Sequence, residues 1–507
     1  MDNKDSSSQD TIKIKDEPTE NIYPKTENTS NSDNKEIEDK LEKTRNLSIK
    51  EGSFASVAAG VGENYVTPYA LSLGANNAHI GYLTSLAGLI GPISQIMGNR
   101  LIEKFERKKL IILFVALQAA SWFLFIIAGT LFLKRIFPEF VVPFLIISYT
   151  IYIIFGSLAA PPWFSMMGDI VPEKIRGRYF SKRNRINGTI SLIVTLGAAF
   201  WLDYSKKENI VIIGFIVLFV IASISRFIST YYFTKHYIPK IKFEKDYYFS
   251  PAQFIKKAPF NNFGRFAIFV ALTHLTVNIA GPFFAVYMLK DLELNYVWFT
   301  TINMSAGLFS IIFFQLWGKF ADKYGNREVL RLSSLLIPII PMLWIFSENP
   351  LYLIFIPQLL SGIAWSGFNL ASSNFIYDAV TVQRRAIVVS YYSLLNGMGI
   401  FIGAIIGGLI TYYVSISFMN MFLFIFLLSG ILRALVFLLI FPHVKEVRKE
   451  IIPTHRNPLL YLKEIKPIYE SLNFRSTPLA GISIFKKKGS LKKETEITKK
   501  PKQESNG

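Results

Sequence analysis

Ionisable side chains inside long apolar blocks are the residues of this sequence that are most able to do chemistry. Four of them lie more than three positions from either end of a block: Glu63, Arg226, His274 and Arg433. A charged group in hydrocarbon is costly unless it is paired or hydrated, so each is a functional candidate. Glu63 is the sole carboxylate in the middle of a block. Because a buried glutamate can titrate near neutral pH, Glu63 is predicted to carry a proton or to contact a substrate. The alternative is a packing role with a fixed partner.

The other three ionisable residues carry weaker predictions. His274 is the only one of the five histidines that lies in the middle of an apolar block. It is a candidate for proton coupling, although neutral hydrogen-bonded histidines are also common in helix packing. Arg226 and Arg433 lie within about two turns of predicted helix ends, where a long side chain can reach the membrane interface. These two arginines are predicted to be structural.

Two asparagines stand four positions before a proline, in Asn64-Tyr-Val-Thr-Pro68 and Asn278-Ile-Ala-Gly-Pro282. Proline lacks an N–H group, so the carbonyl of each asparagine has no helical donor. The pattern predicts a kink with a polar neighbourhood, which suits a gate or a substrate contact. Further polar side chains that could touch cargo lie in otherwise apolar blocks: Asn303, Gln315, Asn369, Asn374 and Asn396.

Twelve apolar blocks must position these residues. The chain has 507 residues, of which 51% are hydrophobic and only 18% are charged. A membrane-spanning helix needs about 20 mostly apolar residues. Composition and block length together predict an all-α membrane protein with twelve transmembrane helices. The predicted spans are residues 52–73, 78–98, 110–133, 140–163, 186–202, 210–232, 264–289, 296–317, 329–347, 350–375, 387–414 and 418–441.

Basic residues concentrate in the loops on one side of the predicted helices. These loops hold seventeen lysines and arginines, whereas the opposite loops hold five. Cytoplasmic loops of membrane proteins carry such an excess of basic residues. We therefore predict a multi-pass protein of the cell membrane with both termini in the cytoplasm.

The two ends of the chain lie outside the predicted spans. Residues 1–50 are polar, mixed in charge and poor in large apolar side chains, which predicts a disordered cytoplasmic tail. Residues 443–507 form a basic cytoplasmic tail, and most of the net charge of +19 lies in it and in the loops. Anionic lipid of the inner leaflet is its expected partner. Nucleic acid is not expected, because the basic run at residues 486–488 has no interleaved aromatic residues.

Paired motifs indicate an internal repeat. The Asn64 motif corresponds to the Asn278 motif, and loops with acidic and basic residues follow both the second and the eighth span. Asp169 corresponds to Asp378, and Arg226 corresponds to Arg433. The separations are 214, 219, 209 and 207 residues. Repeats of this kind are typical of transporter folds. We predict two pseudo-symmetric six-helix bundles, at residues 51–233 and 263–442, joined by a cytoplasmic linker at residues 234–262.

The segment Gly318-Lys-Phe-Ala-Asp322-Lys323-Tyr-Gly325-Asn-Arg327 resembles the signature loop of the major facilitator superfamily, Gly-x-x-x-Asp-Arg/Lys-x-Gly-x-Arg. The copy after the second span keeps the charge pattern but lacks both glycines. The resemblance covers residues 52–442 and extends to prokaryotic permeases with unassigned substrates. It implies transport by alternating access and names no cargo. The predicted gating residues are Glu103, Arg107, Asp169, Arg176, Gly318, Asp322, Lys323, Gly325, Arg327, Asp378 and Arg385.

Four glycines form a stripe of small residues in the eleventh span. They are Gly399, Gly403, Gly407 and Gly408. The stripe resembles an antiporter motif, with Ala404 in the position of its proline, but that motif belongs to the fifth helix of the family. We therefore predict that the stripe lets another helix approach closely.

Several classes of function are excluded by what the sequence lacks. The absence of cysteine excludes disulfides, thiolate metal sites and a cysteine nucleophile. A phosphate-binding loop of the P-loop type is also absent, so ATP hydrolysis does not supply the energy. We predict a secondary active transporter of a small molecule, with protons as a candidate coupling ion. It is expected to be a monomer and not an enzyme, without cofactor or metal. A facilitator without ion coupling and a non-transporting sensor on a carrier scaffold are the alternatives.

Overall fold

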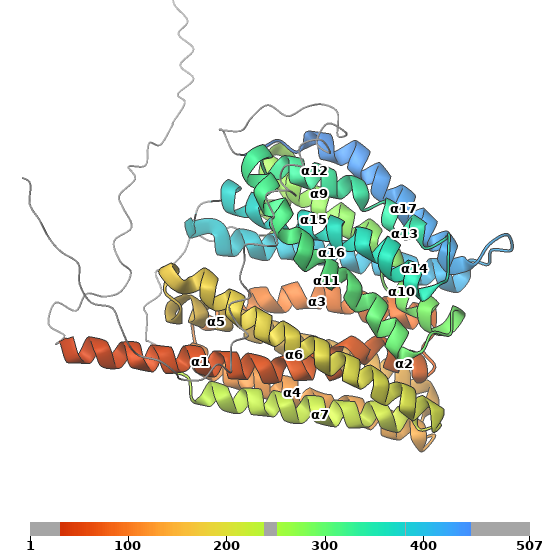
Figure 1. Cartoon of the computed structure of the whole chain (residues 1–507), viewed down its shortest axis with the longest axis horizontal. Helices are drawn as coiled ribbons and strands as arrows, with labels where there is room; N and C mark the ends of the chain where they lie inside the picture. The colour runs from red at the N-terminus through yellow and green to blue at the C-terminus, as the bar shows by residue number, and fades with distance from the viewer. Residues whose placement is uncertain (1–30, 238–250, 381, 448–507) are drawn as a thin grey trace, which may run out of the picture. The chain divides into compact units, whose positions relative to one another are not determined.

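The computed structural model describes residues 31–237, 251–380 and 382–447, with side chains at all of these positions except 31–35, 173, 174, 251, 252 and 382–387 (Figure 1). Every regular element in these ranges is helical. The first half contains α1 (Asn31–Val61), η1 (Glu63–Tyr65), α2 (Val66–Ser72), α3 (Asn77–Ile102), α4 (Arg107–Leu133), α5 (Pro138–Ile170), α6 (Glu173–Lys207) and α7 (Val211–Thr234). The second half contains α8 (Pro251–Lys257), η2 (Ala258–Phe260), α9 (Asn262–Ala280), α10 (Phe283–Val286), η3 (Tyr287–Asp291), α11 (Tyr296–Tyr324), α12 (Asn326–Leu336), α13 (Ile339–Leu343), α14 (Pro350–Leu353), η4 (Ile354–Gln358), α15 (Leu359–Ala379), α16 (Val382–Tyr413), α17 (Met421–Ile440) and η5 (Phe441–His443).

Ten helical segments of the described residues are long and apolar enough to cross a membrane. The other two predicted spans are interrupted helices. Residues 52–73 contain the break between α1 and α2, and residues 329–347 contain the break at Pro338 between α12 and α13. With these two included, the structure accounts for all twelve predicted spans. The all-α membrane fold of two six-helix bundles is confirmed.

Both predicted proline kinks are present as helix breaks. The turn η1 separates α1 from α2 next to Pro68, and Gly281 and Pro282 separate α9 from α10. Each break occurs where a backbone carbonyl has lost its helical donor to a proline. The first and seventh spans, which are partners in the repeat, are therefore interrupted at corresponding places.

The predicted disorder of residues 1–50 is wrong over residues 31–50, because these residues form the beginning of α1. Leu41 and Arg45 lie on a buried face of this segment, with exposed fractions of 5% and 8%. Arg45 Nη1 donates a hydrogen bond to the carbonyl of Ile170, at the end of α5, over 3.1 Å. The sequence does not reveal this buried face of α1, because Leu41 is the single large apolar residue among buried polar ones.

Some predictions fall outside the described residues. These are the disorder predicted for residues 1–30, the middle of the linker at residues 238–250, and the basic tail from residue 448 onward. The described part of the linker contains α8 and η2.

An aromatic core fills the first half. In this half α4 packs against α5 and α7, and α1 packs against α6 and α7. Trp122 and Phe125 from α4 and Phe219 from α7 are fully buried in this core. The rings of Trp122 and Phe219 stack with centroids 5.3 Å apart. The core lies directly behind the η1 break, because a Cβ atom on Gly62 would lie 2.5 Å from the Trp122 ring.

The helix α16 packs against α9 of its own half and against α3 of the first half. A Cβ atom on Gly403 would lie 2.1 Å from the carbonyl oxygen of Leu275 on α9. A Cβ atom on Gly408 would lie 3.3 Å from the Cα atom of Gly81 on α3. The close helix approach that the glycine stripe predicts is confirmed, and it occurs with a helix of each half.

Candidate functional site

The first helix break carries the main candidate residues. Glu63 and Asn64 lie on η1 with exposed side chains. The hydroxyl of Tyr152 on α5 donates a hydrogen bond to Glu63 Oε1. Asn64 Nδ2 donates to Thr195 Oγ1 on α6 over 3.1 Å. The break therefore presents a carboxylate and an amide beside two other helices of the first half.

Buried and half-buried aromatic rings lie on one side of Glu63. The rings of Tyr149 and Tyr152 stack with centroids 6.3 Å apart and planes at 9°. The ring of Trp122 lies 4.6 Å from that of Tyr152, and both side chains are buried. Among the described residues, no basic side chain lies within the 4.0 Å ion-pair distance of Glu63. The carboxylate is held by a phenol rather than by a counterion.

The candidates of the second half lie on α9, α11 and α15. The ring of His274 stacks on that of Trp365 with centroids 6.0 Å apart, and the His274 carbonyl accepts a hydrogen bond from Asn278 Nδ2 over 2.8 Å. Asn303 and Asn369 have exposed side chains. No hydrogen bond between described residues joins these four side chains to the first half. Asn278 therefore binds the backbone of its own helix, and the part of His274 and Asn278 in coupling stays a prediction.

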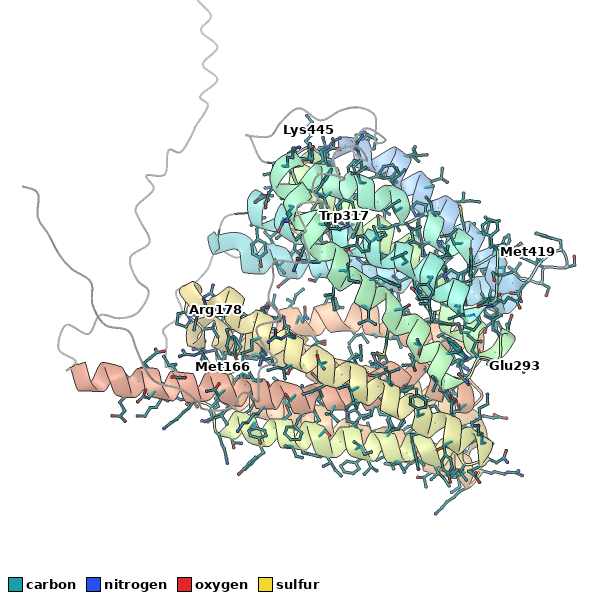
Figure 2. All side chains as sticks on the ribbon, viewed as in Figure 1. Met166, Arg178, Glu293, Trp317, Met419 and Lys445 are labelled. Atoms are coloured by element: carbon teal, nitrogen blue, oxygen red, sulfur yellow. The ribbon has the colours of Figure 1, made fainter. Side chains whose placement is uncertain are left out.

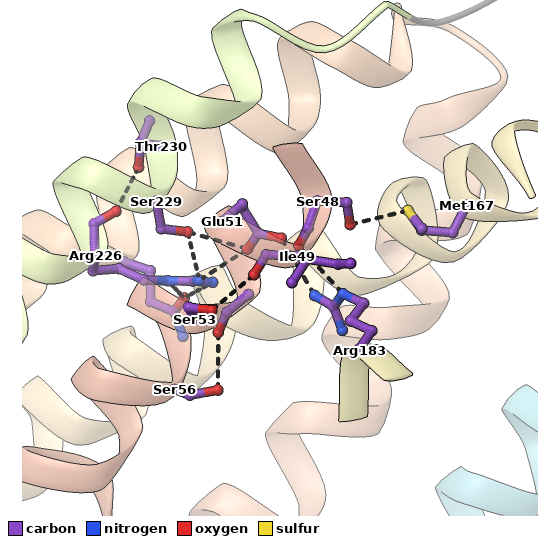
Figure 3. Close-up of polar contacts among 12 residues, drawn as sticks. Ser48, Ile49, Glu51, Ser53, Ser56, Met167, Arg183, Arg226, Ser229 and Thr230 are labelled. Carbon is purple, nitrogen blue, oxygen red and sulfur yellow. Dashed lines mark hydrogen bonds and ion pairs between the residues drawn. The ribbon is translucent and has the colours of Figure 1, made fainter. Parts of the chain in front are cut away.

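A buried ionic cluster, formed by Glu51, Arg183 and Arg226, lies between α1, α6 and α7 (Figure 3). The ion-pair distances to the Glu51 carboxylate are 3.3 Å from Arg183 and 3.9 Å from Arg226. The hydroxyl of Ser229 donates to the same carboxylate over 3.1 Å. Arg226 also donates twice to Gln118 Oε1, over 2.9 and 2.7 Å. The prediction that Arg226 reaches the membrane interface is therefore wrong.

Sequence reasoning missed Glu51, because this residue stands one position before the predicted first span. The available signal was Arg226, since an arginine in an apolar block needs a partner. Only the structure shows that α1 extends far enough to supply that partner.

Arg433 is also buried, but it binds backbone rather than a carboxylate. Its Nη1 atom donates to the carbonyl of Ile337 over 3.2 Å, and its Nε atom donates to Ser429 Oγ over 3.0 Å. The helical donor for the Ile337 carbonyl would be the N–H of residue 341, which is Pro341 and has none. Arg433 satisfies the acceptor that the proline leaves unpaired. It is structural for this reason, and the prediction that it reaches the interface is wrong.

The loops after the second and the eighth span each bind an aspartate at the end of a long helix. Arg107 at the start of α4 forms an ion pair with Asp169 of α5. Asn326 at the start of α12 donates from Nδ2 to Asp378 Oδ2 of α15 over 2.7 Å. The aspartates that the repeat pairs are thus held at corresponding places. Gly325 precedes α12 with a φ of 88°, a left-handed conformation that favours glycine, which explains this signature position.

The same two loops hold the segment that follows each bundle. Lys108 Nζ donates to the carbonyl of His236 after α7 over 2.8 Å. Arg327 Nε donates to the carbonyl of Val444 after α17 over 2.7 Å. Burial lowers the pKa of His236 to about 4, so its imidazole is neutral at physiological pH. These contacts repeat between the halves and tie each loop to the end of its own bundle.

The remaining predicted gating residues lie in the same loops and helix ends. Three have exposed side chains: Glu103, Asp322 and Lys323. A Cβ atom on Gly318 would meet no atom within 4 Å. Arg176 Nη2 donates to two backbone carbonyls near the end of α5, each over 3.4 Å. The side chain of Arg385 lies outside the described residues. The gating role of this group stays a prediction.

At the end of the bundles away from these loops, hydrogen bonds tie the two halves together. Asp203 near the end of α6 accepts hydrogen bonds from the backbone N–H groups of Tyr296, over 2.6 Å, and Val297, over 3.0 Å. These are the first two residues of α11. A carboxylate at a helix N-terminus satisfies amides that lack helical acceptors and interacts favourably with the helix dipole. Close by, the hydroxyls of Tyr65 and Thr300 lie 3.0 Å apart.

The two ends of the bundles differ in these contacts between halves. Figure 2 shows Arg178 and Lys445 toward the end that carries the basic loops, and Glu293 toward the other. At the basic end Asn99 Nδ2, near the end of α3, donates to Ser390 Oγ on α16 over 3.1 Å. The hydrogen bonds that join described residues of α6 to α11 lie at the Asp203 end. The described residues offer no group of three or more His, Cys, Asp or Glu side chains for a metal ion.

Comparisons with known proteins extend these observations. The sequence model of the Major Facilitator Superfamily matches residues 53–265 and 266–491. The tetracycline resistance protein, class B, of Escherichia coli is 33% identical over 101 residues, which are 20% of this chain and 25% of that protein. The nucleoside transporter NupG superposes with a TM-score of 0.59 at 16% identity, over 79% of this chain and 99% of that chain. A D-xylose–proton symporter superposes with a TM-score of 0.58 at 14% identity, over 81% of this chain and 99% of that chain.

Proposed function

Because this chain belongs to the major facilitator superfamily, a family of membrane transporters, we propose that it is a secondary active carrier of a small molecule that works by alternating access. One observation carries this proposal. The helices α6 and α11 are joined across the two halves through Asp203 at one end, while an exposed carboxylate, Glu63, lies at a helix break within the first span. A carrier needs an interface between its two halves that can open at either end. It also needs a polar site partway along that interface.

The basic loops face the cytoplasm in this account, and the protein is a monomer in the cell membrane with both termini inside. The excess of seventeen basic residues over five supports this orientation. The Asp203 end then faces the outside, where its bonds to α11 keep the two halves together. The structure corresponds, in this account, to a state that is closed toward the outside.

Glu63 couples transport to protons. When the site faces the more acidic side, a proton neutralises the carboxylate and removes the cost of moving an anion through the membrane. When the site faces the other side, the hydroxyl of Tyr152 and water stabilise the charged form, and the proton leaves. The proton gradient thereby favours one direction of the conformational change of the carrier.

Uptake into proteoliposomes tests this coupling. Panels of radiolabelled compounds are offered with and without an imposed pH gradient, to the parent protein and to Glu63→Gln. The substitution mimics the protonated acid, so the variant should lose gradient-driven accumulation. Glu139→Gln removes an exposed carboxylate from the first turn of α5 and is the matched control.

Equal responses to the gradient in the parent and in Glu63→Gln would contradict the coupling role. Uptake that is indifferent to the gradient in both proteins would favour a facilitator. A chain that moves no compound and shows no change of conformation would favour a sensor.

A further inference from the structure

Glu63 on η1 lacks the counterions that Glu51 on α1 possesses. The carboxylate of Glu51 binds Arg183 and Arg226. Glu63 accepts a hydrogen bond from Tyr152, and no basic side chain among the described residues lies within the 4.0 Å ion-pair distance. An ionised group within a membrane span is costly unless it is paired or hydrated. The exposed carboxylate of Glu63 can therefore take a partner from outside the chain.

The arginines inside the spans are occupied elsewhere. Arg226 lies on α7 and acts electrostatically on Tyr152, but its guanidinium donates to Gln118 and Ser229 and pairs with Glu51. Arg433 in the second half gives its guanidinium to a serine and to backbone carbonyls. The described spans thus offer an anionic cargo no uncommitted arginine beside Glu63, and the exposed carboxylate itself repels an anion.

The surroundings of Glu63 also strengthen its attraction for a cation. The buried rings of Tyr152 and Trp122 exclude water from one side of the carboxylate, and charges interact more strongly where water is excluded. The half-buried ring of Tyr149 stacks on that of Tyr152, which donates to Glu63. Aromatic faces attract organic cations through their ring electrons. Acid and rings together suit a cation with an apolar body.

We propose that Glu63 and Tyr149 form the binding subsite for an organic cation, and that this cation is the cargo. The inference rests on the proposed carrier function. A single carboxylate balances one positive charge, so a proton and a monovalent cation occupy Glu63 in turn. Exchange of cation for proton is the mode of transport that follows.

Equilibrium binding of radiolabelled tetraphenylphosphonium to the purified full chain tests the subsite. This probe carries a fixed positive charge that does not titrate, so any pH dependence belongs to the protein. The groups that face Glu63 are the phenols of Tyr149 and Tyr152, which stay neutral in the assay range. Binding should be saturable and should weaken at acid pH, because protons compete for the carboxylate. Tetraphenylborate, with the same shape and the opposite charge, should show no saturable binding when it is offered alone.

Variants test the charge of Glu63 and the aromatic ring of Tyr149 separately. Glu63→Gln should lower the affinity by about tenfold or more and abolish its pH dependence, because the ionic attraction is lost. Glu63→Asp keeps the charge and should retain pH-dependent binding. Tyr149→Leu should lower the affinity about threefold or more, through loss of the ring. Glu139→Gln should bind as the parent does. Thermal unfolding of each variant confirms that it is folded.

Two results would overturn the subsite. One is equal affinity for tetraphenylphosphonium in folded parent and Glu63→Gln, and the other is saturable binding of tetraphenylborate offered alone. Spin-label distances between the halves keep this failure distinct from failure of the carrier function. If the halves alternate while the cation does not bind, the cation inference falls and the carrier stands. If the halves do not alternate, the proposed function falls with it.

Discussion

Glu51 on α1 and Glu63 on η1 are two carboxylates with opposite surroundings. Glu51 is buried, and two arginines and a serine bind it. Glu63 is exposed and has a phenol as its hydrogen-bond donor. Removing one member of a buried ion pair leaves an uncompensated charge, whereas removing an exposed charge leaves none. We therefore expect substitution of Glu51 to change stability and substitution of Glu63 to change transport.

Glu51→Gln should destabilise the protein strongly. It leaves Arg183 and Arg226 buried without their carboxylate, which costs about 3 kcal/mol or more. The midpoint of thermal unfolding in detergent should fall clearly. Glu63→Gln is the matched control, because the same substitution removes a carboxylate without an ion-pair partner, and its midpoint should stay near that of the parent. A variant Glu51→Gln as stable as the parent would show that the cluster does not hold α1, α6 and α7 together.

Single residues were predictable from the sequence where a local rule decides them. Gly325 fits its turn because glycine tolerates a positive φ, and the breaks near Pro68 and Pro282 follow from the missing N–H of proline. Glu51 and Asp203 were not predictable. Each stands at the edge of an apolar block, and its partner comes from a helix distant in sequence, which no local pattern reveals.

At the scale of elements, α1 is longer than a membrane requires. Its first part packs beside the α5–α6 connection, where the hydroxyl of Tyr179 donates to the carbonyl of Arg45 over 2.9 Å. Arg45 in turn caps the end of α5 through the Ile170 carbonyl. Apolar spacing predicted the membrane-embedded part of each helix, because about 20 apolar residues leave a strong signal. The first part of α1 leaves only a weak signal in the sequence, because its buried face is mostly polar.

Truncation distinguishes the extension from the residues before it. Deletion of residues 1–30 should leave the thermal unfolding midpoint unchanged, since it removes none of the described contacts. Deletion of residues 1–50 should lower the midpoint, because the Arg45 contacts and the burial of Leu41 are lost. Arg45→Ala in the full chain should reproduce part of the loss. Equal midpoints for the two deletions would mean that the extension contributes nothing to stability.

At the scale of the whole molecule, the two halves repeat each other in sequence and in contacts. Lys108 and Arg327 hold corresponding segments, and Asp169 and Asp378 are bound at corresponding helix ends. The twofold repeat was visible in the sequence, since motif spacing survives the change of individual residues. The contacts between the halves were not visible in the sequence, because the hydrogen bonds from α11 to Asp203 join residues that share no motif.

The distance between the halves at each end is the quantity that alternating access must change. Pairs of spin labels at Arg178 and Lys319 report the basic end, and pairs at Lys206 and Glu293 report the Asp203 end. All four side chains are exposed, and the chain has no cysteine of its own to interfere. Asp203→Ala removes the carboxylate that joins α6 to α11 and should favour opening at its end.

Measurement of both distances by double electron–electron resonance, in the parent and in Asp203→Ala at acid and neutral pH, tests the account most directly. The account predicts reciprocal populations. As the Lys206–Glu293 distance lengthens in Asp203→Ala, the Arg178–Lys319 distance shortens, and pH shifts the balance in the parent but not when Glu63→Gln is added. Distances that stay fixed in every condition, or that lengthen at both ends together, would contradict alternating access.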